Sequence, residues 1–416
     1  MPDLSDQAVA EIARCVRCGA CQGVCPVYDV VRREHAAARG KIHLFERALA
    51  GGDEALQGRR LRDAISLCLK CGRCTVACPN SVRTADVVRH AREIRRSETP
   101  KNLKTVAASE ILADRALMRG SAKFLRLVRS LATQKIEGRP GIVMRLAVPG
   151  EGARRTLPEP PDAGFFESAG GADVVVPGGG KKYLLFTGCV GDVLRPQASE
   201  AVVALARLAG VNVVAPARQV CCGLMSHMTG DRGTAEELAR RNIEVFSMYG
   251  ADAIVTPCAS CATMIESHYP GIMPDAVLPE VITFSEFWSR DLEGRIGSRG
   301  AERSPVVLGF HEPCHMDEGT KERSTVRRML SSLQRAVYVR TAGEDACCGY
   351  GGAFNVEHYG VSRAIGTKKQ AGYRKAHVKL VATECAGCVL QLVDVLADQD
   401  EPPEVITTAE AVERYG

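Results

Sequence analysis

The eighteen cysteines of this 416-residue chain fall into four ordered groups, with none left over. Two groups of four share the spacing Cys-x2-Cys-x2-Cys-x3-Cys-Pro, and they are Cys15, Cys18, Cys21, Cys25 and Cys68, Cys71, Cys74, Cys78. Such a run supplies thiolates to [4Fe-4S] clusters. The spacing therefore predicts that the chain binds iron-sulfur clusters.

The other two groups hold five cysteines each in one shared pattern: a lone Cys, a Cys-Cys-Gly about thirty residues on, then a Cys-x-x-Cys about thirty-five further. They are Cys189, Cys221, Cys222, Cys258, Cys261 and Cys314, Cys347, Cys348, Cys385, Cys388. Adjacent cysteines project apart, so both reach one metal group only across a turn, which Gly223 and Gly349 permit. Five ligands exceed the need of a cubane. Either one cysteine per set is spare, or the cluster is larger or more open.

Two other uses of cysteine compete with this interpretation. A disulfide framework belongs to secreted chains, but residues 1–13 carry acids and lack the apolar stretch of a signal peptide. Structural zinc prefers two pairs of ligands, whereas each run of four has three cysteines at two-residue gaps and a fourth before proline. Zinc is therefore disfavoured in the runs of four and less strongly disfavoured in the sets of five.

Charge is distributed unevenly along the chain. Residues 1–150 hold 27 Lys and Arg against 15 Asp and Glu, and residues 151–416 hold 27 against 34. Two [4Fe-4S] clusters, each with a net charge of about −2 when its four thiolates are included, would still leave the N-terminal part positively charged. Such a surface suits an acidic partner protein or an anionic lipid surface. Nucleic acid is disfavoured because this part has few aromatic residues to stack on bases. We expect a cytoplasmic protein without a transmembrane segment, with peripheral attachment to the inner face of the membrane left open.

The 42 residues between the two runs of four, residues 26–67, are too many for a compact bacterial ferredoxin. Apolar residues recur there at helical spacing, with Gly51 and Gly52 as a break. This predicts an α-helical ferredoxin domain over residues 1–100. By the rule for paired runs, the fourth cysteine of each run binds the cluster of the other run. The ligands of the first cluster are then Cys15, Cys18, Cys21 and Cys78, and those of the second are Cys68, Cys71, Cys74 and Cys25. Gly19 and Gly72 suit close approach of backbone N–H groups to sulfide.

Residues 101–180 connect this domain to the rest. Residues 100–135 show a basic amphipathic pattern, for which a helix docked on its own protein is favoured over a membrane-surface helix. Residues 149–180 are rich in proline and glycine and are interpreted as a linker.

The remaining sequence is an internal duplication, with equivalent cysteines 125 to 127 residues apart. Each copy, 181–300 and 301–416, alternates expected strands and helices, with strands running to Cys189, Cys258, Cys314 and Cys385. The fold class is therefore α/β: a helical two-cluster domain plus two parallel α/β domains related by a pseudo-two-fold axis. Their ligands lie at the carboxyl ends of strands, where open α/β sheets place their sites.

This arrangement resembles the Cys-Cys-Gly-domain iron-sulfur proteins: the heterodisulfide reductase catalytic subunit and the iron-sulfur subunits of glycolate and lactate oxidases. Residues 39–42, Arg-Gly-Lys-Ile, and 311–315, His-Glu-Pro-Cys-His, are similar to signatures of that family. The resemblance implies two cubane [4Fe-4S] clusters in the ferredoxin domain and two noncubane [4Fe-4S] clusters in the five-cysteine sets. Heterodisulfide reductases cleave a disulfide between two such centres. Both sets are complete here, whereas the first set of glycolate oxidase subunits is often degenerate.

Three functions follow as hypotheses. The favoured one is an electron-transfer subunit that works between a flavoprotein dehydrogenase of a 2-hydroxy acid and quinone, through a membrane partner, or another carrier. The second is a disulfide reductase in which Cys222, Cys348 and His315 are catalytic, and the third is a metal-bound scaffold without redox chemistry. No flavin or nucleotide fingerprint is present, so hydride chemistry must come from a partner, and whether the chain itself is an enzyme stays open.

Several polar residues lie near the cysteines in sequence. His311, His315 and His227 are interpreted as hydrogen-bond donors to cluster sulfur, with proton donation as the alternative. Arg17, Lys70 and Arg73 would raise cluster potentials if they face the sulfides; a solvated surface position is equally compatible with the sequence.

Overall fold

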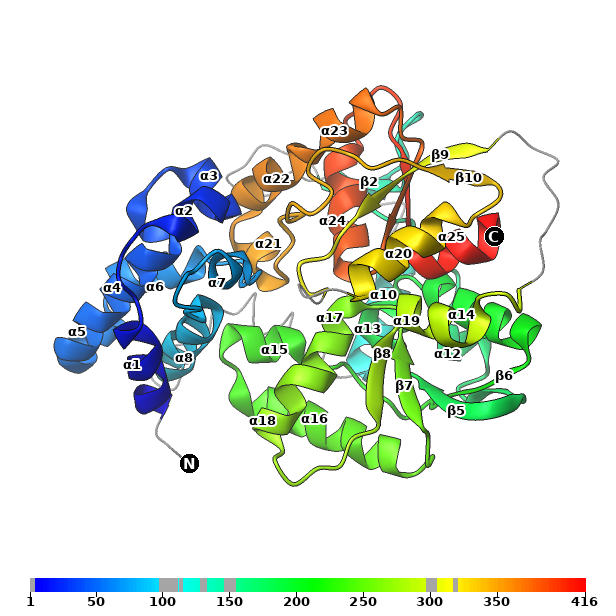
Figure 1. Ribbon diagram of the computed structural model, residues 1–416, viewed down its shortest axis with the longest axis horizontal. Helices are drawn as coiled ribbons and strands as arrows, with labels where there is room; N and C mark the ends of the chain where they lie inside the picture. Colours follow the sequence, from blue (N-terminus) through cyan, green and yellow to red (C-terminus); the bar gives the residue numbers. More distant parts are fainter. Residues whose placement is uncertain are drawn as a thin grey trace. The chain divides into compact units, whose positions relative to one another are not determined.

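The computed structural model describes residues 4–96, 111, 115–127, 133–145, 155–296, 305–316 and 321–416. The chain forms two compact units (Figure 1). The first comprises Met1–Ser109, Leu224–Ala235 and Cys347–Thr367, and the second comprises Glu110–Gly223, Glu236–Ala346 and Lys368–Gly416. Both units are therefore assembled from segments that are distant in sequence.

The first unit is helical and contains both runs of four cysteines. Its N-terminal elements are α1 (Leu4–Ala13), α2 (Ala20–Val24), α3 (Pro26–Val31), η1 (Glu34–Ala36), α4 (Ala38–Ala50), α5 (Gly52–Gln57), α6 (Arg59–Ser66), α7 (Arg73–Val76) and α8 (Thr84–Arg96). The apolar stripes of α1, α4, α6 and α8 form a core around Phe45, Ile65 and Val88. Gly52 has φ +73°, so the break between α4 and α5 falls where the glycine pair predicts it.

Two further segments complete this unit, and both follow a Cys-Cys-Gly turn. The first is α15 (Leu224–Thr229), which packs against α8. The second holds α21 (Ala353–Glu357) and α22 (Tyr359–Thr367), and α22 packs against α3. Their inclusion is not evident from sequence, because nothing in the helix pattern of either segment identifies the unit on which it packs.

The second unit contains two sheets of parallel α/β type. One has the order β4-β6-β5-β7-β8, built from β4 (Val174–Val176), β5 (Gly179–Leu185), β6 (Val211–Ala215), β7 (Ala253–Thr256) and β8 (Glu280–Thr283). The other has the order β10-β9-β11-β12, built from β9 (Val306–His311), β10 (Ala336–Tyr338), β11 (Leu380–Thr383) and β12 (Glu404–Thr407). All neighbours are parallel except β4, which runs antiparallel to β6. The α/β class predicted for this half is confirmed.

Strand ends differ from expectation in one respect. The lone cysteines were expected at the ends of strands, but β5 ends at Leu185 and β9 at His311, three or four residues earlier. Cys189 lies instead in the short helix α13 (Gly188–Val193), which Gly188 enters with φ +66°. The chain turns at the sheet edge before it reaches the cysteine, so a turn and not the strand orients the thiol.

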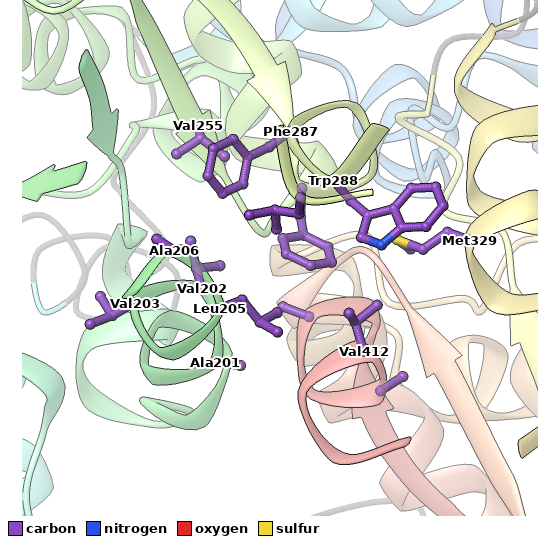
Figure 2. Close-up of a cluster of buried hydrophobic side chains, with 14 of the residues drawn as sticks. Ala201, Val202, Val203, Leu205, Ala206, Val255, Phe287, Trp288, Met329 and Val412 are labelled. Carbon is purple, nitrogen blue, oxygen red and sulfur yellow. The ribbon is translucent and has the colours of Figure 1, made fainter. Parts of the chain in front are cut away.

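Helices cover both sheets, and some of them share one apolar core with the strands. They are α14 (Gln197–Ala209), α16 (Arg232–Ser247), α17 (Ala259–Thr263), η2 (Met264–His268), α18 (Tyr269–Ile272), α19 (Phe284–Phe287), η3 (Trp288–Leu292), α20 (Lys321–Ser331), α23 (Lys369–Lys375), α24 (Ala386–Leu396) and α25 (Thr408–Tyr415). Figure 2 shows Leu205 of α14, Trp288 of η3, Met329 of α20 and Val412 of α25 converging in this core. The two copies therefore bury apolar surface against each other, which is the main stabilising contribution to their association.

The proline- and glycine-rich stretch contains more structure than the linker predicted for it. It includes β3 (Thr156–Leu157), α12 (Phe165–Ser168) and β4, and β3 joins a small antiparallel sheet with β1 (Thr133–Gln134) and β2 (Ile142–Met144). Phe165 and Phe166 are buried, and the Thr156 N–H donates to Oδ1 of Asp394 over 2.7 Å. Burial of these two rings outweighs the low strand propensity of the surrounding prolines and glycines.

The basic amphipathic pattern corresponds in part to α10 (Arg115–Leu127). Met118 is buried against Val193, and Lys123 forms an ion pair with Glu167 at 3.3 Å. α10 is thus docked on its own unit, as the favoured interpretation expects. Residues 100–110, 112–114 and 128–132 of the predicted helical stretch lie outside the described residues. Within the described part of the chain, every helix is too short or too polar to cross a bilayer.

Candidate metal centres

Two cavities in the first unit divide the eight cysteines of the runs of four. One is lined by Cys25, Cys68, Cys71 and Cys74. The other is lined by Cys15, Cys18, Cys21 and Cys78, with Cys74 also at its wall. The fourth cysteine of each run thus lies with the first three of the other run, which is the division given by the paired-run rule.

The backbone of each run has the same unusual conformation. Arg17 and Lys70, each just before a second cysteine, have φ of +57° and +55°. Gly19 and Gly72, each just after it, have φ of +90° and +75°. Such left-handed residues turn successive N–H groups toward one side of the chain and create an anion-binding concavity. Glycine adopts such angles without strain, whereas positive φ at Arg17 and Lys70 carries no sequence signal.

The cysteines of these cavities are poorly placed to ionise as free thiols. Burial, together with the charges of Cys68 and Cys71, raises the pKa of Cys74 to about 12. Burial also raises the pKa of Cys25, although Lys41 opposes the shift. Four thiolates gathered in one cavity repel one another, so a bound cationic core is required to stabilise them together. The donor set and its arrangement therefore fit an iron-sulfur cluster.

The residues of the Arg-Gly-Lys-Ile signature lie at both cavities. Arg39 lines the cavity of the first cluster and Lys41 lines that of the second. Between them, a Cβ added to Gly40 would lie 2.1 Å from the Glu34 carbonyl oxygen, so only glycine fits. The signature can thus be explained by the packing of α4 against η1, with one basic side chain directed to each cavity.

The first five-cysteine set lies within the second unit. Cys221, Cys222, Cys258 and Cys261 are buried, and Sγ of Cys221 is 3.6 Å from Sγ of Cys189. Hydrogen bonds with Cys189 and Cys222 lower the pKa of Cys221, whereas hydrogen bonds with Cys222 and Cys258 raise that of Cys261. These interactions connect all five thiols of the set, which fits the binding of one metal group.

The Cys-Cys-Gly turn of this set is held by polar residues that sequence analysis did not identify. Asn242 donates to the Cys221 carbonyl over 3.0 Å and accepts from the Val220 N–H over 2.9 Å. The hydroxyl of Tyr269 donates to the Cys222 carbonyl over 3.0 Å. Asn242 and Tyr269 are buried and lie twenty or more residues from the turn, so only the fold reveals their role.

The two Cys-Cys-Gly turns have the same geometry. Gly223 has φ +87° and donates its N–H to Sγ of Cys221 over 3.5 Å. Gly349 has φ +89° and donates to Sγ of Cys347 over 3.4 Å. Any other residue is strained at these φ values. The turn therefore has the glycine-dependent shape that adjacent cysteines were expected to require.

The cysteines of the second five-cysteine set belong to different units. Cys314, Cys385 and Cys388 belong to the second unit, whereas Cys347 and Cys348 belong to the first. Within the first unit, Cys347 is hydrogen-bonded to Cys71 and thereby raises the pKa of Cys71. A cysteine of the ferredoxin runs thus contacts a cysteine of a Cys-Cys-Gly set.

The two copies also meet through their Cys-x-x-Cys segments. Cys258 is hydrogen-bonded to Cys385, and the Ala259 N–H donates to the Glu384 carbonyl over 2.7 Å. Ser260 Oγ lies 3.2 Å from Sγ of Cys385 and 2.9 Å from Nδ1 of His315. His315 is thus close to a cysteine of its own set through Ser260, a residue that sequence analysis did not identify.

The remaining histidines differ in surroundings. His311 is fully buried at the end of β9, and neither ring nitrogen has a hydrogen-bond partner among the described residues. Burial, reinforced by Lys369, lowers the pKa of His311, so the ring is neutral. An orphaned neutral imidazole close to Cys385 fits a site that a bound group completes. His227 is buried in α15 of the first unit, whereas Cys222 belongs to the second.

Two family models match the chain. The model described as "Cysteine-rich domain" matches residues 183–266 and 308–393, and the model described as "4Fe-4S dicluster domain" matches residues 11–82. These are the duplicated copies and the ferredoxin region deduced from the sequence.

Curated relatives match over most of their length. The "Probable glycolate oxidase iron-sulfur subunit" of Bacillus subtilis is 25% identical over 92% of this chain and 88% of that protein. A fumarate reductase (CoM/CoB) subunit of Methanothermobacter marburgensis is 25% identical over 94% of this chain and 69% of that protein. The "Glycolate oxidase iron-sulfur subunit" of Escherichia coli is 22% identical over 93% and 91%. With its dicluster domain and two cysteine-rich domains, the chain belongs to the Cys-Cys-Gly-domain iron-sulfur protein family.

Proposed function

We propose that this chain is the electron-transfer subunit of a multi-subunit oxidoreductase, working between a flavoprotein dehydrogenase of a 2-hydroxy acid and quinone or another carrier. Two of the relatives are named as glycolate oxidase iron-sulfur subunits, and others as lactate utilization protein A. The absence of a nucleotide fingerprint in the sequence supports the need for a separate flavoprotein. The basic N-terminal part offers that partner a complementary surface if the partner is acidic.

Two cubane clusters are assigned to the two cavities of the first unit, and two noncubane [4Fe-4S] clusters to the five-cysteine sets. The cavity linings support the first assignment, and the buried, proton-sharing thiols support the second. Bound there, the clusters supply one-electron transfer. The protein holds them in buried surroundings, fixes the thiols by glycine turns, and keeps successive ligand sets in contact.

A series of sulfur contacts carries the proposal. Cys71 of the ferredoxin runs contacts Cys347, and the five-cysteine pattern assigns Cys347 to the same set as Cys385. Cys385 in turn contacts Cys258 of the other set. Each step joins two ligand sets through neighbouring cysteines. A relay needs closely spaced, enclosed centres, and the contacts Cys71–Cys347 and Cys258–Cys385 support such a spacing.

Disulfide reduction at paired Cys-Cys-Gly centres is the second candidate. It is favoured by one observation, the Ser260–His315 pair beside Cys385, because a hydroxyl and an imidazole next to a ligand sulfur can deliver a proton to a leaving thiolate. Cys222, Cys348 and His315 would then be catalytic. The relay is preferred because it requires no substrate to enter among these buried residues.

Organisation and location belong to the same proposal. The shared strand order of the two sheets supports a pseudo-two-fold relation between domains 181–300 and 301–416, preceded by a ferredoxin domain over 1–100 and a connecting region over 101–180. Eighteen free cysteines support a reducing, cytoplasmic compartment, with the membrane reached through a quinone-reactive partner.

The test is reconstitution with a lactate- or glycolate-oxidising flavoprotein. Anaerobic mixing of the iron-loaded chain, the flavoprotein and its hydroxy acid should produce the EPR signals of reduced clusters, and omission of the flavoprotein should abolish them. Raising the salt concentration should weaken the transfer if the basic surface docks the partner. Unreduced clusters in the complete mixture with each flavoprotein would contradict the proposal.

A further inference from the structure

The two cysteine runs of the first unit place a basic residue at the same position. Each reads Cys-x-basic-Cys-Gly, with Arg17 in the first run and Lys70 in the second. Both residues have left-handed φ, +57° and +55°. Because the backbone is the same, any difference in what the two cations do must come from their surroundings.

At the first cavity the basic side chains are neutralised at the surface. Arg17 pairs with Glu46 at 2.7 Å, with 58% and 43% of the two side chains exposed. Arg39 pairs with Glu34 at 2.6 Å, and these side chains are 31% and 53% exposed. Exposed, paired charges have little influence on a neighbouring site because water and the partner carboxylate screen them.

At the second cavity two of the three basic lining side chains are buried, and the third, Arg73, is half-buried. Lys41 and Lys70 line the cavity and are 2% and 6% exposed. Lys41 donates to the Ala36 carbonyl, and Lys70 donates to the Met228 carbonyl.

A further cation, the half-buried Arg92, is close by. Arg92 donates to the Cys68 carbonyl over 3.3 Å and to the Met228 carbonyl over 3.0 Å. Among the described residues no carboxylate lies within ion-pair distance of Lys41, Lys70 or Arg92. Burial lowers the pKa of Lys70 and of Arg92, and the charges of Cys68 and Glu357 oppose that shift. In a buried region such charges are screened far less than those at the first cavity.

We propose that Lys41, Lys70 and Arg92 set the reduction potential of the cluster of Cys25, Cys68, Cys71 and Cys74 above that of the cluster of Cys15, Cys18, Cys21 and Cys78. The inference rests on the proposed binding of both clusters. Reduction adds one electron, taken from an external donor such as dithionite, and therefore one negative charge. Unneutralised cations near the second cluster stabilise that charge, and net charge is among the factors that tune cluster potential. Lys41, Lys70 and Arg92 act here as positioning and tuning residues, without themselves being ligands.

The gradient has a direction that suits the relay. The second cluster includes Cys71, which contacts Cys347. An electron that enters at the first cluster is thus drawn to the cluster that contacts Cys347. Two clusters of equal reduction potential would provide no such bias.

The experiment is an anaerobic redox titration of the full-length, iron-loaded chain, followed by EPR, in the wild type and in Lys70→Met, Lys41→Met, Lys70→Arg and Arg17→Met. Wild type should show two resolved potentials for the cubane clusters. Lys70→Met and Lys41→Met should each lower the higher of the two reduction potentials. At a fixed solution potential, the ratio of reduced to oxidised cluster should fall at least tenfold, which corresponds to a shift of about 59 mV for a one-electron couple. Lys70→Arg should restore it, and the matched control Arg17→Met should move neither potential comparably.

The outcomes separate the inference from the proposed function. Iron-loaded protein in which Lys70→Met and Lys41→Met shift the lower potential, or shift neither, would overturn the inference alone. So would an equal shift in Arg17→Met. Wild-type protein that holds no cubane cluster by iron and sulfide analysis would overturn the proposed function and the inference with it. Using two independent lysines keeps the test decisive if one variant fails to fold.

Discussion

Ser260 Oγ of the first Cys-Cys-Gly copy lies 3.2 Å from Sγ of Cys385 in the second copy. The two copies are not equivalent here, because the residue that corresponds to Ser260 in the second Cys-x-x-Cys is Gly387. Gly387 has no hydroxyl and therefore cannot form the corresponding hydrogen bond with a cysteine of the first copy. The duplication therefore differs at the contact between its two cysteine sets, where Ser260 reaches Cys385 and Gly387 has no side chain to make the reciprocal contact.

Replacing Ser260 should separate this contact from the rest of the fold. A hydrogen bond to ligand sulfur stabilises the reduced centre, so Ser260→Ala should lower the potential of the centre bound by Cys385 by about 20–60 mV, the one-electron equivalent of about 0.5–1.5 kcal/mol. Thr263→Val is the matched control, because Thr263 Oγ1 donates to the His315 carbonyl over 2.9 Å and has no hydrogen bond to sulfur among the described residues. Equal potentials in Ser260→Ala and wild type, by EPR titration, would show that the hydroxyl does not act on the centre.

The number of clusters follows from the four complete cysteine groups. Anaerobically prepared protein should hold about sixteen irons and a matching amount of sulfide per chain. Chemical analysis of iron and acid-labile sulfide measures both. A value near eight irons would restrict the clusters to the runs of four and leave the five-cysteine sets empty or bound to zinc.

The division of the first eight cysteines makes a specific prediction for Cys25→Ser. Because Cys25 lines the cavity of Cys68, Cys71 and Cys74, the substitution should perturb that cluster and leave the cluster of the first run intact. EPR of the reduced protein reports the two clusters separately, and Cys78→Ser is the reciprocal variant. Damage in Cys25→Ser confined to the cluster of the first run would disprove the exchange of ligands.

Iron-free protein should lose stability at alkaline pH. The pKa of Cys74 is raised from an ordinary value of 9.0 to about 12, so the folded state favours the protonated thiol. This contribution, at most about 4 kcal/mol, is fully present below pH 9 and is lost as the pH rises toward 12. Anaerobic denaturant unfolding of iron-free protein between pH 8 and 11 measures it. Iron-free Cys74→Ser should show a shallower dependence, and an unchanged slope in that variant would rule out Cys74 as the cause.

Much of the fold was accessible from sequence because apolar patterns are local. Strands β6, β7 and β11 lie where runs of buried residues such as Ala253–Thr256 predict them, and the repeated cysteine spacing identifies the duplication. The strands to the lone cysteines were predicted too long because a turn such as that at Gly188 interrupts the apolar run without changing its composition. The linker was predicted wrongly for a related reason: the burial of Phe165 and Phe166 depends on partners elsewhere in the chain.

The candidate ligands were visible from spacing alone, but their environment was not. Lys70 and Arg17 occupy equivalent positions, yet one is buried and the other forms a surface ion pair. Ser260, Asn242 and Tyr269 contact the cysteine sets through tertiary structure, with no motif to identify them. The membership of Leu224–Ala235 and Cys347–Thr367 in the helical unit is likewise a property of long-range packing.

The most direct test of the relay is a disulfide reductase assay on the isolated, iron-loaded chain. Reduced methyl viologen serves as electron donor and the CoM–CoB heterodisulfide as probe, with wild type, Cys222→Ser and Cys348→Ser compared and cubane clusters verified by EPR. The relay predicts no oxidation of viologen that depends on the disulfide, and no change in the EPR of the oxidised protein when thiol or disulfide is added. Turnover in wild type that is lost in both variants, with the cubane clusters intact, would contradict it and make Cys222 and Cys348 catalytic.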